Sequence, residues 1–315
     1  MSNAIILHNP VSDASRQDEL DVLDQVDLIA ETLSMLGYSS KSLEFTLNSS
    51  ALYKLLKDNP VSVVFNLVET INDSGRFSFV AAAMLELFKV SFTGSGAEAI
   101  FLTTDKLVCK TMLIFNNIKT PAWARDLAEV DPDVIYLIKP ISEDGSVGID
   151  DAQLYSGKEL KKIPEGYFAE AYIHGREFNI SIIAGEKSFQ VLPPAEMCFS
   201  KEFYTNKPRI LGYNAKWDEH SMEYQNTTRS FQFKESDQIL YSELKEIAGK
   251  CWRIFGLRGY ARVDIRVGDD GLPQVIEINA NPCIAPDSGF IAACHEAGLN
   301  NIEIIKRIIH DAKQY

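Results

Sequence analysis

Two neighbouring segments near the end of the chain alternate apolar and polar side chains with a period of two. They are YARVDIRV (260–267) and PQVIEINAN (273–281). This period is typical of β-strands with one buried face, so Ile276 and Ile278 are expected on the apolar side of the second strand. The connector GDDGLP is rich in turn-forming residues. The sequence therefore predicts an antiparallel hairpin.

The polar face of this hairpin carries the chemistry. If Val267 pairs with Gln274, four polar side chains share one face, with Asp264 opposite Glu277 and Arg262 opposite Asn279. Two carboxylates facing each other at roughly 4.5–5.5 Å repel, so a positive charge is expected between them. Their oxygens, with the Asn amide, suit Mg²⁺ or Mn²⁺ rather than zinc. A solvated, charged hairpin is the alternative, and a one-residue register slip would turn the polar set to the other face.

The first third of the chain alternates between predicted strands and helices. Strands are predicted at 4–8 and 61–68, a helix at 17–37 with Gly37 as its C-terminal stop, and further helices around 76–88 and 104–117. Leu20, Leu23, Ile29, Leu33 and Leu36 are expected to form the buried face of the helix at 17–37. This order predicts a parallel sheet flanked by helices.

The remainder of the chain is predicted to form an α+β unit. Its strands are expected at 134–140, 167–173 and 177–185, with the glycine-containing turn EDGSVGI at 143–149. Residues 199–230 show no sustained period, and an irregular stretch of this length predicts a functional loop. An amphipathic helix is predicted at 238–256, with Ser236 as its N-cap.

Composition excludes several classes of protein. The formal charge of -13 argues against nucleic acid as a partner but permits a small anionic substrate. Five cysteines without a C-x-x-C pair predict neither a disulfide framework nor a thiolate zinc site. The N-terminus lacks the basic region of a signal peptide, and the longest apolar segment is too short to span a bilayer. We therefore expect a cytoplasmic protein that contacts no membrane.

The hairpin and several other segments resemble one known family. ARVDIRV followed by VIEINANP is similar to the metal-binding hairpin of the ATP-grasp ligases, in their D-alanine:D-alanine ligase branch. Further matching segments follow the same chain order: VVFNLVE, FTGS, TTDK, LIKP, EAYIHGREF and YNAKW. The resemblance implies an α/β (α+β overall) ATP-grasp fold. It divides the chain into an N-terminal parallel-sheet domain (1–103), a central subdomain (104–175) and a C-terminal catalytic subdomain (176–315), with ATP between the last two.

The resemblance also implies roles for individual residues. Those implied to bind ATP are Lys106, Lys139, Glu170, Tyr172, Ile173, Glu177 and Lys216, with Tyr172 and Ile173 in a hinge that reads adenine through its main chain. Asp264, Glu277 and Asn279 are implied to hold Mg²⁺ or Mn²⁺, as two ions. The catalytic set comprises Arg262 at the developing oxyanion, Ser146 in the turn over the phosphates, and Lys216. Ser288 and Gly289 lie where the family contacts its second substrate.

The chain departs from the family pattern in the region that would bind the first substrate. The glycine-rich N-terminal segment with its substrate-binding glutamate is absent, and either Glu19 or Glu69 is a candidate to hold a substrate ammonium. Gly145 replaces a second loop serine. Trp217, counted among the substrate-binding residues, replaces a tyrosine. The nucleotide half therefore matches better than the acceptor half.

The implied activity is an ATP-dependent carboxylate–amine ligase. Such an enzyme forms a peptide bond through an acyl phosphate and releases ADP and phosphate; the resemblance also implies small-molecule substrates and a homodimer. Two alternatives remain open at this point: an amino-acid or dipeptide ligase with other substrates, and a nucleotide-binding regulatory protein without catalysis. A dehydrogenase could be argued from GSGAEA (94–99), but no strand with a terminal acid follows at the usual distance.

Overall fold

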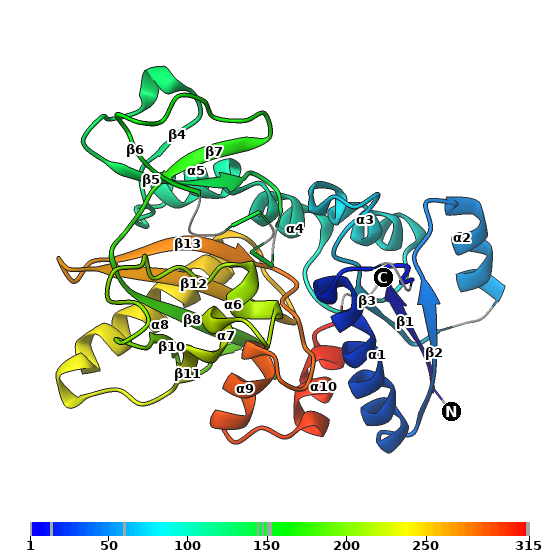
Figure 1. Ribbon diagram of the computed structural model, residues 1–315. Helices are drawn as coiled ribbons and strands as arrows, with labels where there is room; N and C mark the ends of the chain where they lie inside the picture. Colours follow the sequence, from blue (N-terminus) through cyan, green and yellow to red (C-terminus); the bar gives the residue numbers. More distant parts are fainter. Residues whose placement is uncertain are drawn as a thin grey trace.

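The computed structural model describes residues 2–12, 15–58, 61–143, 145–146, 148–149 and 153–312. Its strands form three sheets, each accompanied by helices (Figure 1). In the described part of the chain, no helix is long and apolar enough to cross a membrane. The five cysteines are free thiols, as expected. The predicted α/β class is thus confirmed, whereas the predicted domain boundaries stay a prediction.

The N-terminal sheet is parallel, as predicted. The central strand β1 (Ser2–His8) pairs with β2 (Tyr38–Glu44) on one side and β3 (Val63–Leu67) on the other. The connecting helices are α1 (Gln17–Met35) and α2 (Ser49–Asp58). Gly37 follows α1 with a φ of +80°, which confirms the predicted stop, because this left-handed conformation favours glycine.

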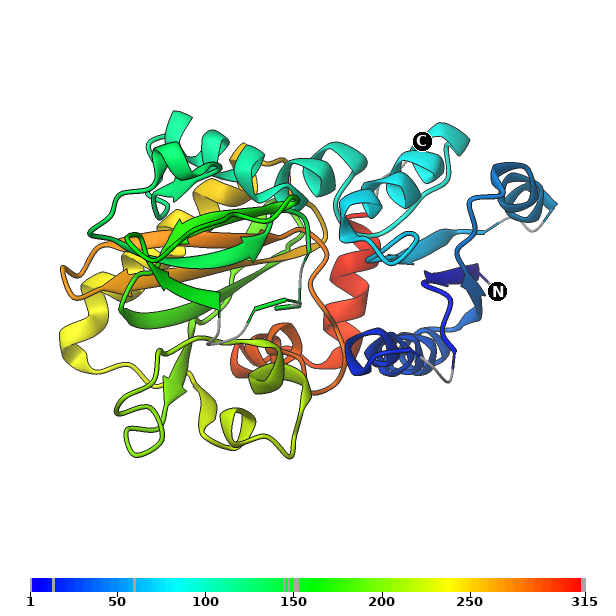
Figure 2. The ribbon, with the colours of Figure 1, turned by 45° about the horizontal axis from the view of Figure 1, so that its top comes forward.

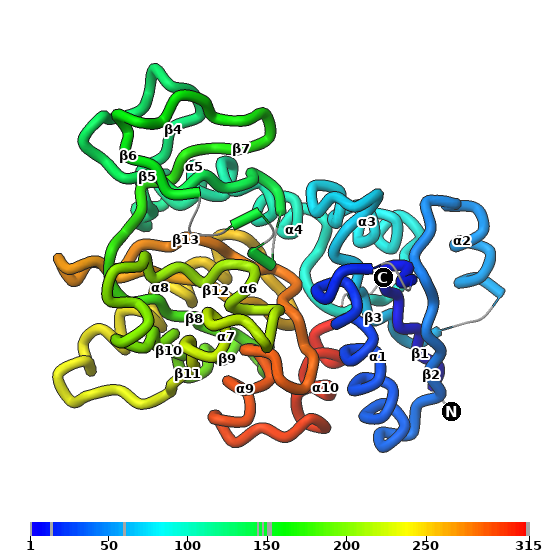
Figure 3. Tube along the Cα trace, in the orientation of Figure 1, coloured from blue at the N-terminus to red at the C-terminus, as the bar shows by residue number. Residues whose placement is uncertain are grey.

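The buried face of α1 agrees only in part with the predicted one. Of the predicted residues, Ile29 and Leu33 are buried but Leu23 is 43% exposed, and Val22 and Val26, which were not predicted, are buried as well. The helix packs between the N-terminal sheet and the C-terminal helix α10 (Asn301–His310), and these two neighbours together decide which residues are covered. Figures 2 and 3 show α10 beside α1, although the two helices come from opposite ends of the chain.

The helices after β3 lead from the N-terminal sheet towards the rest of the molecule. The predicted helix at 76–88 appears as the short η1 (Gly75–Phe77) and α3 (Phe79–Phe88). The helix predicted around 104–117 is confirmed as α5 (Lys106–Phe115), and α4 (Ala97–Thr104), which was not predicted, precedes it and ends at Asp105. The Asp105 side chain accepts hydrogen bonds from the first N–H groups of α5 and therefore starts a new helix.

A four-stranded antiparallel sheet follows, with the order β4-β7-β5-β6. Its strands are β4 (Trp123–Ala124), β5 (Ile135–Pro140), β6 (Leu154–Ser156) and β7 (Tyr167–Ala171), and the short η2 (Leu127–Glu129) connects β4 to β5. In Figure 1 this sheet lies above the largest sheet of the molecule.

The largest sheet has the order β11-β10-β8-β12-β13, and β9 also pairs with β8. Its strands are β8 (Gly175–Ala184), β9 (Phe189–Val191), β10 (Ala195–Phe199), β11 (Thr227–Ser230), β12 (Tyr260–Gly268) and β13 (Pro273–Asn279). The strands β7 and β8 follow one another in the chain yet belong to different sheets. Gly175 begins β8 with its backbone so close to β12 that a Cβ would lie 2.0 Å from the Val267 carbonyl oxygen.

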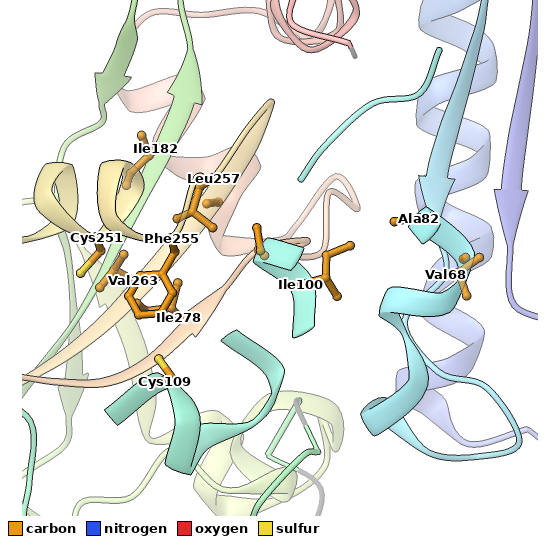
Figure 4. Close-up of a cluster of buried hydrophobic side chains, with 14 of the residues drawn as sticks. Val68, Ala82, Ile100, Cys109, Ile182, Cys251, Phe255, Leu257, Val263 and Ile278 are labelled. Atoms are coloured by element: carbon orange, nitrogen blue, oxygen red, sulfur yellow. The ribbon is translucent and has the colours of Figure 1, made fainter. Parts of the chain in front are cut away.

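One face of the large sheet is apolar and is covered by α8 (Gln238–Ile254). Ile182, Val263 and Ile278 from the sheet pack with Cys251 and Phe255 of the helix region (Figure 4). Ile100 and Cys109 join the same cluster from α4 and α5, so these helices are anchored to the large sheet as well. The predicted N-cap Ser236 is wrong, since η4 (Glu235–Asp237) precedes α8 and places Asp237 at that position.

The opposite face of the large sheet is polar along β8 and β12, and α9 (Gly289–Glu296) and α10 cover only one end of it. The stretch predicted as an irregular loop at 199–230 lies over this region and is partly regular. It contains α6 (Tyr213–Trp217), α7 (Met222–Gln225) and β11. These elements are too short to give a readable period in the sequence.

Candidate active site

The hairpin of β12 and β13 places its polar residues as predicted, but by a different register. Asp264 faces Glu277 and Arg262 faces Asn279. The predicted pairing of Val267 with Gln274 is wrong, because Val267 faces Pro273. A β-bulge next to Asp264 adds one residue to β13 and restores the expected pairing beyond it.

The bulge also changes the direction of one side chain. Ile278 is 2% exposed and lies in the core, as predicted, whereas Ile276 lines a cavity together with Glu277. The expectation that Ile276 and Ile278 share a face is therefore wrong. The extra residue breaks the alternation at this point, and an apolar side chain joins the polar side of the hairpin.

Asp264 is buried and surrounded by donors. Arg262 donates from Nε to Oδ1 at 2.7 Å and from Nη2 to Oδ2 at 2.8 Å. Asn179 of β8 donates its amide to Oδ1 at 2.9 Å. A paired guanidinium thus provides one of the positive charges that two facing carboxylates require.

Glu277 is paired with a second cation. Lys106 Nζ lies 2.9 Å from Glu277 Oε1, and it also donates to the Glu143 carbonyl oxygen at 2.6 Å. Burial raises the pKa of Glu277, but the charges of Lys106, Lys139 and Lys216 outweigh it and hold that pKa well below its ordinary value. Glu277 is consequently ionised at neutral pH.

The donor set of the hairpin fits a hard divalent cation. Asp264, Glu277 and Asn279 offer two carboxylates and an amide oxygen on one face, and such oxygens are the ligands that Mg²⁺ prefers. No group of three or more His, Cys, Asp and Glu side chains in the described ranges is arranged to hold a metal, and the hairpin itself offers two of these residues and an Asn. The metal-binding role of the trio remains a prediction.

A cavity between the four-stranded and the large sheet gathers most of the residues predicted to bind ATP. Its lining includes Lys139, Glu170, Tyr172, Ile173, Glu177 and Lys216. Lys106 is connected to this group through Glu277, which also lines the cavity. Leu137, Ile210 and Leu211 supply apolar walls, which suit a planar base beside charged groups for phosphates.

A buried ion-pair network that the sequence did not predict supports one wall of this cavity. Glu170 lies between Lys110 Nζ at 2.6 Å and Lys139 Nζ at 3.1 Å. Burial raises the pKa of Glu170, but the two lysines reverse the effect and lower it. Lys110 is 2% exposed and follows Lys106 by four residues in α5. That spacing puts both lysines on one helix face, and it was the feature of the sequence from which the role of Lys110 could have been predicted.

The hinge predicted to bind adenine through its main chain lies just after β7, and one of its main-chain groups is already hydrogen-bonded. The Tyr172 N–H donates to the Ile135 carbonyl oxygen at 2.8 Å, so this residue retains only its carbonyl group for a base. Glu177 stands on the opposite wall, where Arg266 lies 3.5 Å away. Burial raises the pKa of Glu177, and the charge of Arg266 opposes this effect.

A second cavity, of about 480 Å³, adjoins the first. Its lining includes the predicted catalytic residue Arg262 and the predicted substrate-binding residues Ser288, Gly289 and Trp217, and Lys216 lines both cavities. Glu19 does not line it, since its carboxylate accepts from the Arg16 N–H at 2.8 Å and caps α1. Glu69 does line the cavity, so the geometry favours Glu69 over Glu19 as the partner of a substrate ammonium.

Comparison with known proteins identifies the family. The family model described as "D-ala D-ala ligase C-terminus" matches residues 119–310, more than half of the chain. The chain belongs to the D-alanine–D-alanine ligase family.

Individual relatives agree with this assignment to the D-alanine–D-alanine ligase family. An uncharacterized protein, y4sG of Sinorhizobium fredii, is 30% identical over 78% of this chain and 73% of its own length. The D-alanine–D-alanine ligase of Aquifex aeolicus is 27% identical over 89% of this chain and 92% of its own. In fold, the D-alanine–D-alanine ligase of Bacillus anthracis, solved with ATP, superposes with a TM-score of 0.73 at 20% identity, covering 99% of this chain and 97% of that one. The ATP-grasp fold and the ATP-dependent ligase class follow.

In this D-alanine–D-alanine ligase family member, hydrogen bonds join the turn at 143–149 to the stretch at 199–230, and these two segments are candidates for lids over the site. Ser146 Oγ donates to the Leu211 carbonyl oxygen at 2.7 Å, and Trp217 Nε1 donates to the Gly145 carbonyl oxygen at 2.9 Å. The hydroxyl of Ser146 is therefore engaged with the second lid. Asp144 and Val147, which belong to the predicted turn, lie outside the described residues.

Proposed function

We propose that this protein is an ATP-dependent amino-acid ligase that joins the carboxylate of one amino acid to the amine of another. The observation that carries the proposal is the position of the Asp264 and Glu277 pair. Both carboxylates line the cavity that contains the predicted nucleotide residues. Their hairpin partners Arg262 and Asn279 line the adjoining cavity. A phosphoryl group and an amino-acid carboxylate would meet at this boundary.

Activation of the carboxylate is the first step. A carboxylate is a poor acyl donor, so the γ-phosphoryl group is transferred to it, which forms an acyl phosphate and releases ADP. Lys106 lies 2.9 Å from Glu277, and Lys139 and Lys216 line the same cavity as Glu277, so the three ammonium groups would neutralise phosphates bound there. Mg²⁺ held by Asp264, Glu277 and Asn279 would supply further positive charge at the phosphate oxygens.

Attack by the amine is the second step. The amine adds to the carbonyl carbon of the acyl phosphate, and the negative charge moves onto the former carbonyl oxygen. Arg262 extends into the substrate cavity and provides a donor for this oxyanion. One such donor contributes roughly 3–4 kcal/mol to transition-state stabilisation. The attacking nitrogen loses a proton to the departing phosphate as the adduct collapses, which leaves the peptide bond, and the joined lids keep water from the acyl phosphate.

The substrates are amino acids in this proposal, and D-alanine, which the relatives' names specify, is the reference substrate. Glu69 would hold the ammonium of the first amino acid, since it lines the substrate cavity. Trp217 in place of the family's tyrosine favours a substrate other than D-alanine. The proposal includes a cytoplasmic homodimer that acts on small molecules, as the family resemblance implies.

The experiment is ATP turnover across a panel of D- and L-amino acids, supplied singly and in pairs. Release of ADP that depends on an amino acid, with a peptide identified by mass, is the expected result. If ATP binds but no amino acid stimulates ADP release, the proposal fails and the regulatory alternative replaces it. The presence of Arg262, Asp264 and Glu277 in one site favours the enzyme.

A further inference from the structure

A guanidinium group that the predicted site did not include projects into the substrate cavity. Arg229 lies on β11, the edge strand of the large sheet, where it pairs with Met197 of β10. Arg229, Thr227 and Met197 all line the cavity. Residues two apart on a strand share a face, so the strand geometry itself directs Arg229 inward.

Arg229 stands at the mouth of the cavity, against the start of α9. A Cβ added to Gly289 would lie 3.4 Å from Arg229 Nη2 and 3.7 Å from its Cζ. The side chain remains accessible to solvent there. Ser288, the N-cap of α9, is the adjacent residue and lines the same cavity.

The charge of Arg229 has no direct partner among the described residues, since it forms neither an ion pair nor a hydrogen bond with any of them. Burial and the charge of Arg262 lower its pKa, whereas Asp287 and Tyr224 raise it. The second guanidinium of the cavity, that of Arg262, is already paired with Asp264. An anion in the cavity would therefore relieve the repulsion between two arginines.

Acidic side chains also line the cavity. Asp21 and Asp24 of α1 line it together with Glu69. A zwitterionic substrate fits this arrangement, with its ammonium near the acids and its carboxylate near the cations. With about 480 Å³, the cavity also exceeds the volume that two alanines would fill. Arg229 at the mouth is thus available to bind a group that alanine does not have.

We propose that Arg229 binds a side-chain carboxylate of the acceptor substrate, which makes that acceptor a dicarboxylic amino acid of the aspartate or glutamate type. The inference rests on the proposed ligase function. A guanidinium and a carboxylate match in a two-pronged geometry, so this pair would discriminate strongly against the neutral side-chain amides.

The test compares aspartate with asparagine and glutamate with glutamine, in both enantiomers, as acceptors in the amino-acid-dependent ADP-release assay. Alanine is the reference, and product masses identify the acceptor. The native protein is expected to favour the dicarboxylic member by about tenfold or more in kcat/KM, the range of one hydrogen-bonded charge pair. Arg229→Gln should remove this preference and leave the values for the amides and alanine unchanged.

Two further variants make the outcome decisive. Arg125→Gln makes the same chemical change at an exposed arginine outside both cavities and should preserve the preference. Asp287→Asn removes a negative charge near Arg229 and should lower KM for the dicarboxylic acceptor. ATP-dependent thermal stabilisation verifies that each variant is folded.

The contradicting results are distinct from a failure of the ligase proposal. If kcat/KM for alanine or the amides equals that for aspartate and glutamate, the ligase proposal is retained and the assignment of Arg229 is overturned. If Arg229→Gln impairs every acceptor equally, Arg229 binds the common α-carboxylate instead. If no amino acid supports ADP release, both proposals fall together.

Discussion

Arg262 and Asp264, two residues apart on β12, form a two-pronged ion pair with N···O distances of 2.7 and 2.8 Å. The pair crosses the boundary between the two cavities, because Asp264 lines the nucleotide side and Arg262 the substrate side. In the proposed reaction, the guanidinium of Arg262 would have two competing partners: the carboxylate of Asp264 and the oxyanion formed in the substrate cavity.

Arg262→Gln is predicted to lower kcat by about 10²–10³-fold while changing KM for ATP little, because the oxyanion forms only in the transition state. Steady-state ADP release checks this prediction. Arg125→Gln serves as the matched control at an exposed site. A rise in KM alone, with kcat preserved, would show that Arg262 acts only in substrate binding.

Glu277→Gln is predicted to abolish amino-acid-dependent ADP release, since it removes a charge from the proposed metal site and from the partner of Lys106. The exposed Glu186→Gln provides the matched control. Circular dichroism would establish that the variant is folded. Turnover at the native rate in a folded Glu277→Gln protein would refute the metal assignment.

Lys110→Met is predicted to destabilise the protein by about 3–5 kcal/mol, because it leaves a buried carboxylate with one of its two cations. It should also raise KM for ATP, since Lys139 would then be the sole ion-pair partner of Glu170 among the described residues. Urea denaturation and ADP-release kinetics measure the two effects. Lys158→Met, at an exposed pair with Asp133, should cost under about 1 kcal/mol.

The stability of the protein should fall in acid partly through Glu170. Its pKa is lowered in the folded state, so the unfolded chain binds the proton first as the pH falls through the ordinary value of 4.5. The contribution is therefore complete above that value and is lost as the pH falls towards the folded pKa. Unfolding free energies from pH 7 downward would measure it, and Glu170→Gln should show a shallower decline. An unchanged slope would mean that Glu170 does not contribute to the acid sensitivity.

The sequence predicted those features that repeat with a fixed period or resemble a family segment. The hairpin partners Asp264 and Glu277 were found in this way. The bulge at Ile276 was missed, although the two consecutive apolar residues Val275 and Ile276 interrupt the alternation at this point. The correct partners were nevertheless reached, because the bulge restores the assumed register at Asp264 and beyond it.

The missed site residues have a different cause. Lys110 resembles an ordinary solvated helix lysine in the sequence, and its ion-pair partner Glu170 lies 60 positions later, on strand β7. Arg229 belongs to a strand of four residues within an aperiodic stretch. The sequence therefore did not predict which face of the strand carries Arg229 or that Arg229 lines a cavity. The surroundings of both residues depend on contacts between segments that are distant in the sequence, and a local pattern does not predict such contacts.

The short connection between β7 and β8 affects the width of the nucleotide site. Glu170 and Glu177 stand on opposite walls of one cavity, and only the residues between them connect the two sheets at this point. Gly175 fixes the lower end of the connection, because its contact with Val267 leaves no space for a side chain. The number of residues in the connection at 172–174 therefore determines the distance between the two walls of the cavity. We expect the addition of one residue there to weaken nucleotide affinity without altering any group that contacts the nucleotide.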